Sequence, residues 1–141
     1  MEINYFGLLA MCRTFAPILK TNGGGAIINI LSIVARVNSP IIGSYSASKA
    51  AALSLTQGVR AELAAQGTLV VAAMPGTVDT KASKDYPPPK ISPAEVAKAA
   101  LQAVIDGVEE VYPGEQATDT AAQLLKDPKA VEKQFAQMLP T

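Results

Sequence analysis

The sequence predicts an α/β protein in which about three parallel strands are flanked by helices. Two short runs, residues 26–31 and 69–74, are apolar on both faces except at Asn29, which is typical of strands buried between helix layers. A long helical segment, residues 45–66, connects them. A strand, a crossover helix and a second strand form a parallel unit, and a short third strand is expected over residues 108–112.

Composition indicates one globular unit over residues 1–141. Hydrophobic residues make up 49% of the chain and charged residues 17%, which favours a packed core over disorder. Twelve basic and twelve acidic residues cancel without forming blocks, which argues against nucleic acid or an anionic membrane as a partner. The apolar runs are far shorter than the roughly 20 residues that cross a bilayer, so we expect a soluble protein.

The residue types that are missing narrow the chemistry. The chain contains no histidine, which excludes Ser-His-Asp and Cys-His nucleophile systems and metal sites built on histidine. Acid–base chemistry near neutral pH would therefore need Tyr, Lys or carboxylates with shifted pKa values. The single cysteine, Cys12, cannot form an intrachain disulfide, and residues 1–4 lack a secretory pattern. We therefore expect a cytoplasmic protein.

Helices are predicted on both sides of the first strand. Residues 3–20 leave little polar surface and form a helix buried on more than one side, which Pro17 would break or kink in its last turn. Residues 45–66 form a helix that Gly67 closes, with one flank apolar and another small and mixed. Two such flanks indicate two contacts, one with the sheet and one with another subunit.

The second half of the chain alternates polar and helical segments. Residues 77–91 are rich in Lys, Ser, Asp and Pro and are expected to form a mobile loop over the site. Ser92, Pro93 and Glu95 together predict a helix start, and the helix should end near Asp106 because Gly107 follows. Residues 115–141 form a polar, helical tail in which a helix restarts at residues 127–128 and runs to about residue 138.

The candidate chemistry centres on Tyr45 and Lys49. Residues four apart lie one turn apart on one face of a helix, and a nearby ammonium would lower the pKa of a phenol by favouring phenolate. Ser32, thirteen residues before Tyr45, follows a buried strand, where the sites of open parallel sheets are found. A Tyr-x-x-x-Lys pair alone is equally compatible with a solvated helix face.

Two further motifs change that balance. Asn4-x-x-Gly7 precedes the triplet in a helix, and Pro75-Gly76-Thr77-Val78-Asp79-Thr80 follows the next strand. With these motifs in this order and spacing, the chain up to about Tyr112 strongly resembles the short-chain dehydrogenase/reductase family. The resemblance implies a partial Rossmann-like, doubly wound parallel sheet. It also implies hydride transfer between NAD or NADP and a small carbonyl or alcohol substrate.

The resemblance assigns a role to each of four catalytic residues. Tyr45 would exchange a proton with the substrate oxygen, and Ser32 would hold that oxygen by a hydrogen bond. Lys49 would bind the hydroxyls of the nicotinamide ribose, and Asn4 would bind a water that relays protons to Lys49. The cofactor would also be lined, beside Tyr45 and Lys49, by Pro75, Gly76, Val78 and Thr80.

The chain departs from the family pattern at its beginning. The Gly-rich phosphate loop and the residue that reads the adenosine ribose are absent. Gly23-Gly24-Gly25 cannot replace that loop because it precedes a strand instead of opening a helix. The chain starts about where the family's middle helix starts, so it resembles the C-terminal half of such an enzyme. The sequence therefore leaves the choice between NAD and NADP open.

This truncation predicts self-association. The strand over residues 26–31 would lack a neighbour on one edge, leaving backbone groups and apolar side chains uncovered. Either that edge pairs with another copy, or helices 3–20 and 45–66 form a four-helix interface in a homodimer. An alternative function stays open: a catalytically silent oligomerisation module that keeps the four residues but cannot hold a dinucleotide.

Overall fold

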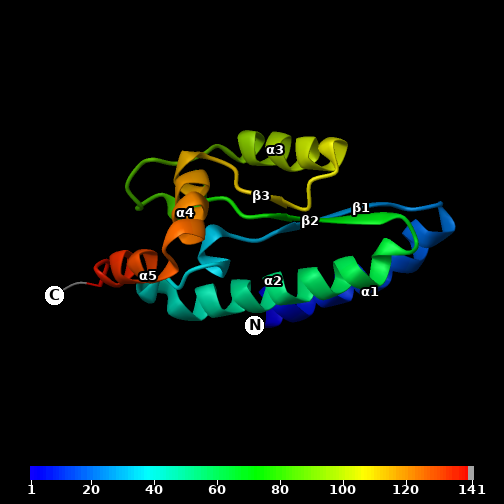
Figure 1. Cartoon of the computed structure of the whole chain (residues 1–141), viewed down its shortest axis with the longest axis horizontal. Helices are drawn as coiled ribbons and strands as arrows, with labels where there is room; N and C mark the ends of the chain where they lie inside the picture. Colours follow the sequence, from blue (N-terminus) through cyan, green and yellow to red (C-terminus); the bar gives the residue numbers. More distant parts are fainter. Residues whose placement is uncertain (140–141) are drawn as a thin grey trace.

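The computed structural model describes residues 1–139 and contains one parallel sheet (Figure 1). Its three strands, in the order β1-β2-β3, are β1 Gly25–Ile30, β2 Thr68–Ala73 and β3 Glu110–Val111. The predicted α/β class with a parallel sheet is thereby confirmed. The third strand is shorter than the expected 108–112, because the Val108 amide donates to Ala103 O (2.8 Å) and is taken up by the preceding helix end.

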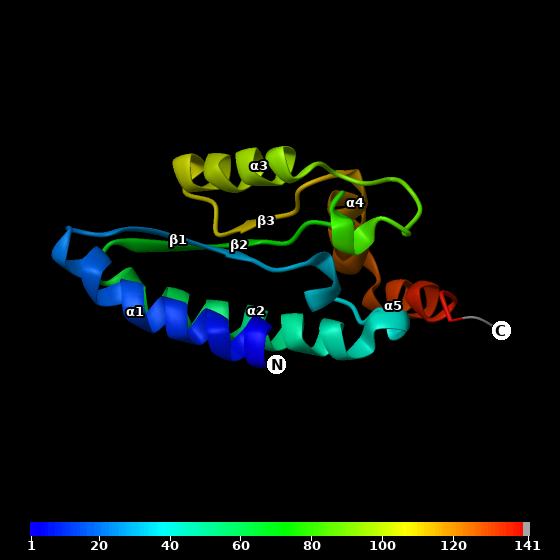
Figure 2. The same ribbon diagram turned by 180° about the vertical axis from the view of Figure 1, so that it is seen from behind.

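Helices cover both faces of the sheet. Helices α1 Leu8–Thr21 and α2 Gly43–Ala64 lie on one face, and α3 Pro93–Asp106 lies on the other (Figures 1 and 2). Between them, Val70, Val71, Ala72 and Ala73 of β2 are completely buried. The central strand is apolar on both sides because each side faces a helix layer.

The chain continues into helices α4 Glu115–Lys126 and α5 Pro128–Ala136. The predicted helical restart at residue 128 is confirmed, with the Asp127 carboxylate accepting the Ala130 N–H at 3.0 Å. Helix α4 packs through Ala117 and Ala121 against Ile33, which follows the end of β1. This part of the tail is therefore part of the core near the candidate site.

The N-terminal helix differs from the expected single element. A π-helical turn, η1 Glu2–Gly7, precedes α1. Of the break or kink expected at Pro17, the break is wrong, since α1 continues through Pro17 to Thr21, and the kink stays a prediction. Pro17 is exposed, so the Arg13 carbonyl that loses its helical partner can bond water, and the helix tolerates the loss.

Residues 77–91 form a connection closed by its own hydrogen bonds. At its base, Val78 and Ile91 form an isolated bridge. Inside the connection, the Lys90 ammonium donates to Ser83 O (2.8 Å) and Lys84 O (3.2 Å). It also pairs with the Asp79 carboxylate at 3.9 Å. The expected mobility of this connection stays a prediction.

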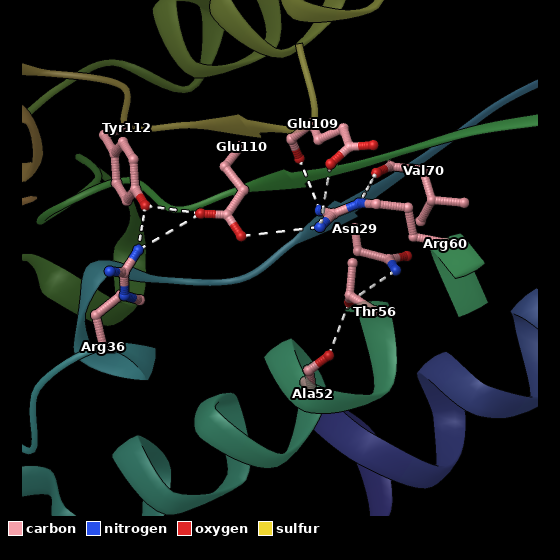
Figure 3. A network of polar contacts seen from close by, with 9 residues as sticks. All are labelled: Asn29, Arg36, Ala52, Thr56, Arg60, Val70, Glu109, Glu110 and Tyr112. Atoms are coloured by element: carbon pink, nitrogen blue, oxygen red, sulfur yellow. Dashed lines mark hydrogen bonds and ion pairs between the residues drawn. The ribbon is translucent and has the colours of Figure 1, made fainter. Parts of the chain in front are cut away.

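A polar network ties α2 to the far edge of the sheet (Figure 3). Arg60 donates from Nε to Val70 O (3.0 Å) and from Nη2 to Glu109 O (2.9 Å). Its Nη1 also lies 3.6 Å from Glu109 and 3.9 Å from Glu110 carboxylate oxygens. Glu110 in turn pairs with Arg36, at 3.4 Å. The network thus connects α2, β2, β3 and the loop after β1.

Within residues 1–139, no helix combines the length and the apolar character that crossing a membrane requires.

Candidate active site

Ser32 is fixed where β1 ends. Backbone pairing continues beyond the strands, with Leu31 N–H donating to Ala73 O (2.8 Å) and Ile33 N–H to Pro75 O (2.9 Å). The Ser32 hydroxyl accepts the Val34 N–H at 3.4 Å and lies 3.5 Å from Pro75 O, to which it donates. Ser32 is therefore held at the carboxyl end of the sheet, beside the turn that follows β2.

Tyr45 and Lys49 lie on one face of α2, as their spacing predicted. The Lys49 ammonium is 5.6 Å from the centroid of the Tyr45 ring, a cation–π distance. It donates to Ile30 O at 3.0 Å. Tyr45 is 39% exposed, so its hydroxyl can meet a ligand. The Ser32 hydroxyl is near enough to lower the pKa of Tyr45 by hydrogen bonding.

The expected lowering of the Tyr45 pKa by Lys49 is wrong for this structure. Partial burial raises the pKa of Tyr45 above 10, the nearby Ser32 hydroxyl opposes this, and repulsion from Tyr86 adds to it. Burial also lowers the pKa of Lys49 below 10.5. Burial of the phenol is the largest cause of the shift, and the Lys49 ammonium donates to a backbone carbonyl, Ile30 O.

Asn4 meets α2 through Ser48. The Asn4 amide nitrogen donates to the Ser48 hydroxyl at 3.0 Å, and Ser48 donates to Tyr45 O at 2.7 Å. Asn4 comes from the π-helical turn η1, a distortion that often marks functional positions. Asn4 therefore contacts α2, the helix that carries Tyr45, at Ser48, which is the residue before Lys49.

A groove of about 530 Å³ opens beside these residues, between α1 and the free edge of β1. Its polar side chains are Asn4, Asn29 and Lys49, while Leu8, Cys12, Phe15 and Ile28 are among its apolar lining. Cys12 is buried, and burial raises the pKa of its thiol. Cys12 is thus packed as a small apolar residue.

The predicted cofactor-lining residues form the turn after β2. Pro75 is buried, while Gly76 and Val78 are half-buried. Thr80 is engaged in a capping box with Ser83, in which the Thr80 N–H donates to Ser83 Oγ at 3.1 Å. Through the contact of Ser32 with Pro75 O, this turn lies next to the first strand's end. The structure thus places Pro75 next to Ser32.

Three participants were missed by the sequence reasoning. The Ser48 hydroxyl accepts a hydrogen bond from Asn4, and Ile30 O accepts one from Lys49. Gln116 of α4 accepts the Thr77 N–H at 2.9 Å. Ser48 lies three residues after Tyr45, and that helical spacing was a usable signal. The other two contacts depend on tertiary packing, for which the sequence carries no local signal.

Sequence comparison identifies relatives for most of the chain. The family profile described as short chain dehydrogenase matches residues 1–90. A short chain dehydrogenase of Monascus purpureus is 40% identical over 86 residues, which are 61% of this chain and 30% of that protein. An uncharacterised oxidoreductase of Staphylococcus aureus strain MRSA252 is 35% identical over 107 residues, which are 74% of this chain and 46% of that protein. The chain therefore spans less than half the length of these curated relatives.

Solved structures with the same fold include dinucleotide complexes. A short chain dehydrogenase from Burkholderia cenocepacia, in complex with NADP, is 49% identical, with a TM-score of 0.92 over 99% of this chain and 58% of that one. A short-chain dehydrogenase from Sphingobium yanoikuyae, in complex with NADPH, is 26% identical, with a TM-score of 0.71 over 98% of this chain and 55% of that one.

Proposed function

Because this chain belongs to the short chain dehydrogenase family, we propose that it carries the catalytic residues of an oxidoreductase. The reaction is hydride transfer between NAD or NADP and a carbonyl or alcohol substrate. The observation that supports this most is the grouping of Ser32, Tyr45 and Lys49 at the carboxyl end of β1. Ligand sites of open parallel sheets occur at that end.

Tyr45 is the proton donor of the proposed reaction. Its raised pKa keeps the phenol protonated at neutral pH, so it can give a proton to a substrate oxygen as negative charge develops there. Ser32, whose hydroxyl acts on the same phenol, is positioned to share that oxygen. The protonated phenol is the form that carbonyl reduction requires, and the reverse reaction requires the phenolate.

Lys49 and Asn4 serve the cofactor side. The Lys49 side chain lines the groove, where its ammonium can donate hydrogen bonds to ribose hydroxyls. Asn4 uses its amide nitrogen for Ser48, and its carbonyl oxygen can hold a water that passes protons on to Lys49. These two roles are inferred from the family resemblance and the position of both side chains on one groove.

The residues fit only one half of a dinucleotide. The nicotinamide and its ribose would be bound by Lys49, Tyr45 and the turn that contains Pro75, Gly76, Val78 and Thr80. When bound, that ring supplies or accepts the hydride. Within residues 1–139, no Gly-rich turn opens a helix after a strand, so the pyrophosphate and adenosine need groups outside this set. Because a similar solved protein carries NADP, NADP is the first candidate.

The assembly proposed with this function is a cytoplasmic homodimer. Helix α1 and the turn before it expose several large apolar side chains, namely Ile3, Phe6, Met11, Phe15 and Ile18. A second copy that packs its own α1 and α2 against this surface would remove it from water, which is the main driving force for association. The proposed occupant is another copy of this chain.

Titration with NADH and NADPH tests the proposal. We expect saturable binding of one of them, followed by nicotinamide fluorescence. Lys49→Ala should weaken this binding at least about tenfold, because a charged hydrogen-bond donor is lost. Lys129→Ala, which removes a lysine whose side chain is 78% exposed, is the matched control and should have no effect.

A second measurement separates the enzyme from the silent module. Tyr45→Phe should still bind the dinucleotide saturably but reduce turnover of carbonyl substrates by about 10²–10⁴-fold. Absence of saturable binding by the unsubstituted chain would contradict the proposal and favour the oligomerisation module.

A further inference from the structure

The first turn of α4 touches the turn that follows β2. Gln116 Oε1 accepts the Thr77 N–H at 2.9 Å. This contact passes directly over Gly76: a Cβ built on Gly76 would lie 2.4 Å from Gln116 Oε1 and 3.2 Å from Gln116 Cβ. Gly76 is not among the glycines with positive φ, so its backbone would accept other residues. The glycine is needed here for space, and Gln116 is what fills that space.

Helix α4 is itself anchored to the other side of the site. Ala117, the residue after Gln116, is completely buried and packs with Ala121 against Ile33. Ile33 is the neighbour of Ser32. The Thr118 hydroxyl donates to Tyr112 O at 2.9 Å and to Gly114 O at 3.0 Å, which fixes the start of the helix. One helical turn thus contacts both the Ser32 loop and the turn after β2.

The turn after β2 is held at both ends. At Pro75, the carbonyl accepts the Ile33 N–H at 2.9 Å and the Ser32 hydroxyl at 3.5 Å. At Thr77, the N–H is held by Gln116, and the carbonyl accepts the Ile91 N–H at 2.9 Å. Removing the Gln116 contact would free the Thr77 amide while leaving the Pro75 end in place.

We propose that Gln116 is a positioning residue for the nicotinamide side of the site, holding the Pro75–Thr77 turn at a fixed place relative to Ser32. This inference rests on the proposed function. Gln116 acts through the turn and does not need to touch cofactor or substrate. The residue comes from the segment that the sequence predicted only as a tail.

Three substitutions of glutamines on α4 test this. Gln116→Met keeps the length of the side chain but removes the acceptor, Gln116→Glu keeps an acceptor, and Gln123→Met makes the same change two turns further along the exposed side of α4. Circular dichroism checks that each protein is folded. The first readout is the exchange rate of the Thr77 amide by NMR. The second is the Kd for whichever of NADPH and NADH the unsubstituted chain binds more tightly.

We expect Gln116→Met to speed Thr77 amide exchange and raise the Kd, each by about fivefold, the size of one ordinary hydrogen bond. Gln116→Glu should restore both values towards those of the unsubstituted chain, and Gln123→Met should change neither. Unchanged exchange or an unchanged Kd in Gln116→Met would overturn the positioning role alone. If the unsubstituted chain binds neither dinucleotide, the proposed function fails and this inference fails with it, whatever the Thr77 exchange rate shows.

Discussion

The Lys49 ammonium lies over the Tyr45 ring, 5.6 Å from its centroid. Its hydrogen bond goes to Ile30 O. Lys49 therefore presents a cation to the groove, while burial raises the pKa of the Tyr45 phenol. In the proposed reaction, Tyr45 is accordingly assigned as the proton donor.

The stability of the protein should depend on Tyr45 at alkaline pH. Because the folded state raises the pKa of Tyr45 above its unfolded value near 10, the protonated phenol is favoured on folding. That contribution is present below about pH 10 and is lost as the pH rises through the folded pKa. Urea unfolding of the unsubstituted chain and Tyr45→Phe should show a constant free-energy difference from pH 6 to 8. Above pH 10 the unsubstituted chain should lose stability relative to the variant. An unchanged difference at pH 11 would contradict the raised pKa.

Arg60 should be among the most important polar residues for stability. Its side chain is only 16% exposed and donates to two backbone carbonyls while facing Glu109 and Glu110 (Figure 3). Arg60→Met should lower the free energy of unfolding by about 2 kcal/mol, because two backbone carbonyls lose a charged donor and Glu110 keeps only Arg36 as a cation. Urea denaturation followed by circular dichroism measures this.

The control for the Arg60 substitution is a lysine in a solvent-exposed ion pair. Lys129 and Glu132 are 78% and 61% exposed, so Lys129→Met should change the free energy of unfolding by less than about 0.5 kcal/mol. Equal effects of the two substitutions would show that the network adds little to the fold.

Gly76 and Gln116 should be energetically coupled. Gly76→Ala places a Cβ against the Gln116 side chain and should destabilise the protein by about 1–2 kcal/mol. In a Gln116→Ala background the same change should cost less, because the contacts to Oε1 and Cδ are gone and only the Cβ, at 3.2 Å, remains, while alanine also restricts the unfolded chain. A double-mutant cycle by urea unfolding should give a coupling of about 1 kcal/mol or more. Additive effects would mean that the two side chains do not compete for this space.

Self-association should depend on α1 and not on α3. Met11 and Ile18 lie two turns apart on α1 and are 59% and 50% exposed. Replacing both by Glu should convert a dimer to a monomer in sedimentation equilibrium, because charged groups would have to be buried. The same double change at Leu101 and Ile105 of α3, which are 59% and 76% exposed, is the control and should leave the dimer intact. If the double substitution on α3 dissociated the dimer instead, the interface would lie on the face of the sheet that α3 covers.

Features encoded over a few residues were predictable from the sequence. Helix α3 begins at Ser92 with a capping box to Glu95 and ends at Gly107 with a φ of 68°. Each partner in these motifs lies within a turn of the other, so residue type and spacing determine the contact. The same holds for the shared face of Tyr45 and Lys49.

Features that depend on tertiary approach were not predictable. The spacing of Lys49 from Tyr45 selects a helix face, but the flexible lysine stem leaves open which acceptor the ammonium reaches, and Ile30 O is nineteen residues away in sequence. Gln116 meets Thr77 across thirty-nine residues. The direction of the Tyr45 pKa shift was therefore misjudged, because it depends on burial rather than on spacing.

The π-helical turn ahead of α1 sets the angle at which Asn4 leaves the helix axis. Phe6 N–H reaches back five residues to Met1 O (3.3 Å), so this turn accommodates one residue more than the α-helical turns that follow. Deleting a single residue here would let the helix relax to ordinary geometry at little cost. That relaxation would change the position of Asn4 around the axis and, with it, the contact to Ser48. The chain can therefore lose this contact through a change that leaves its overall architecture intact.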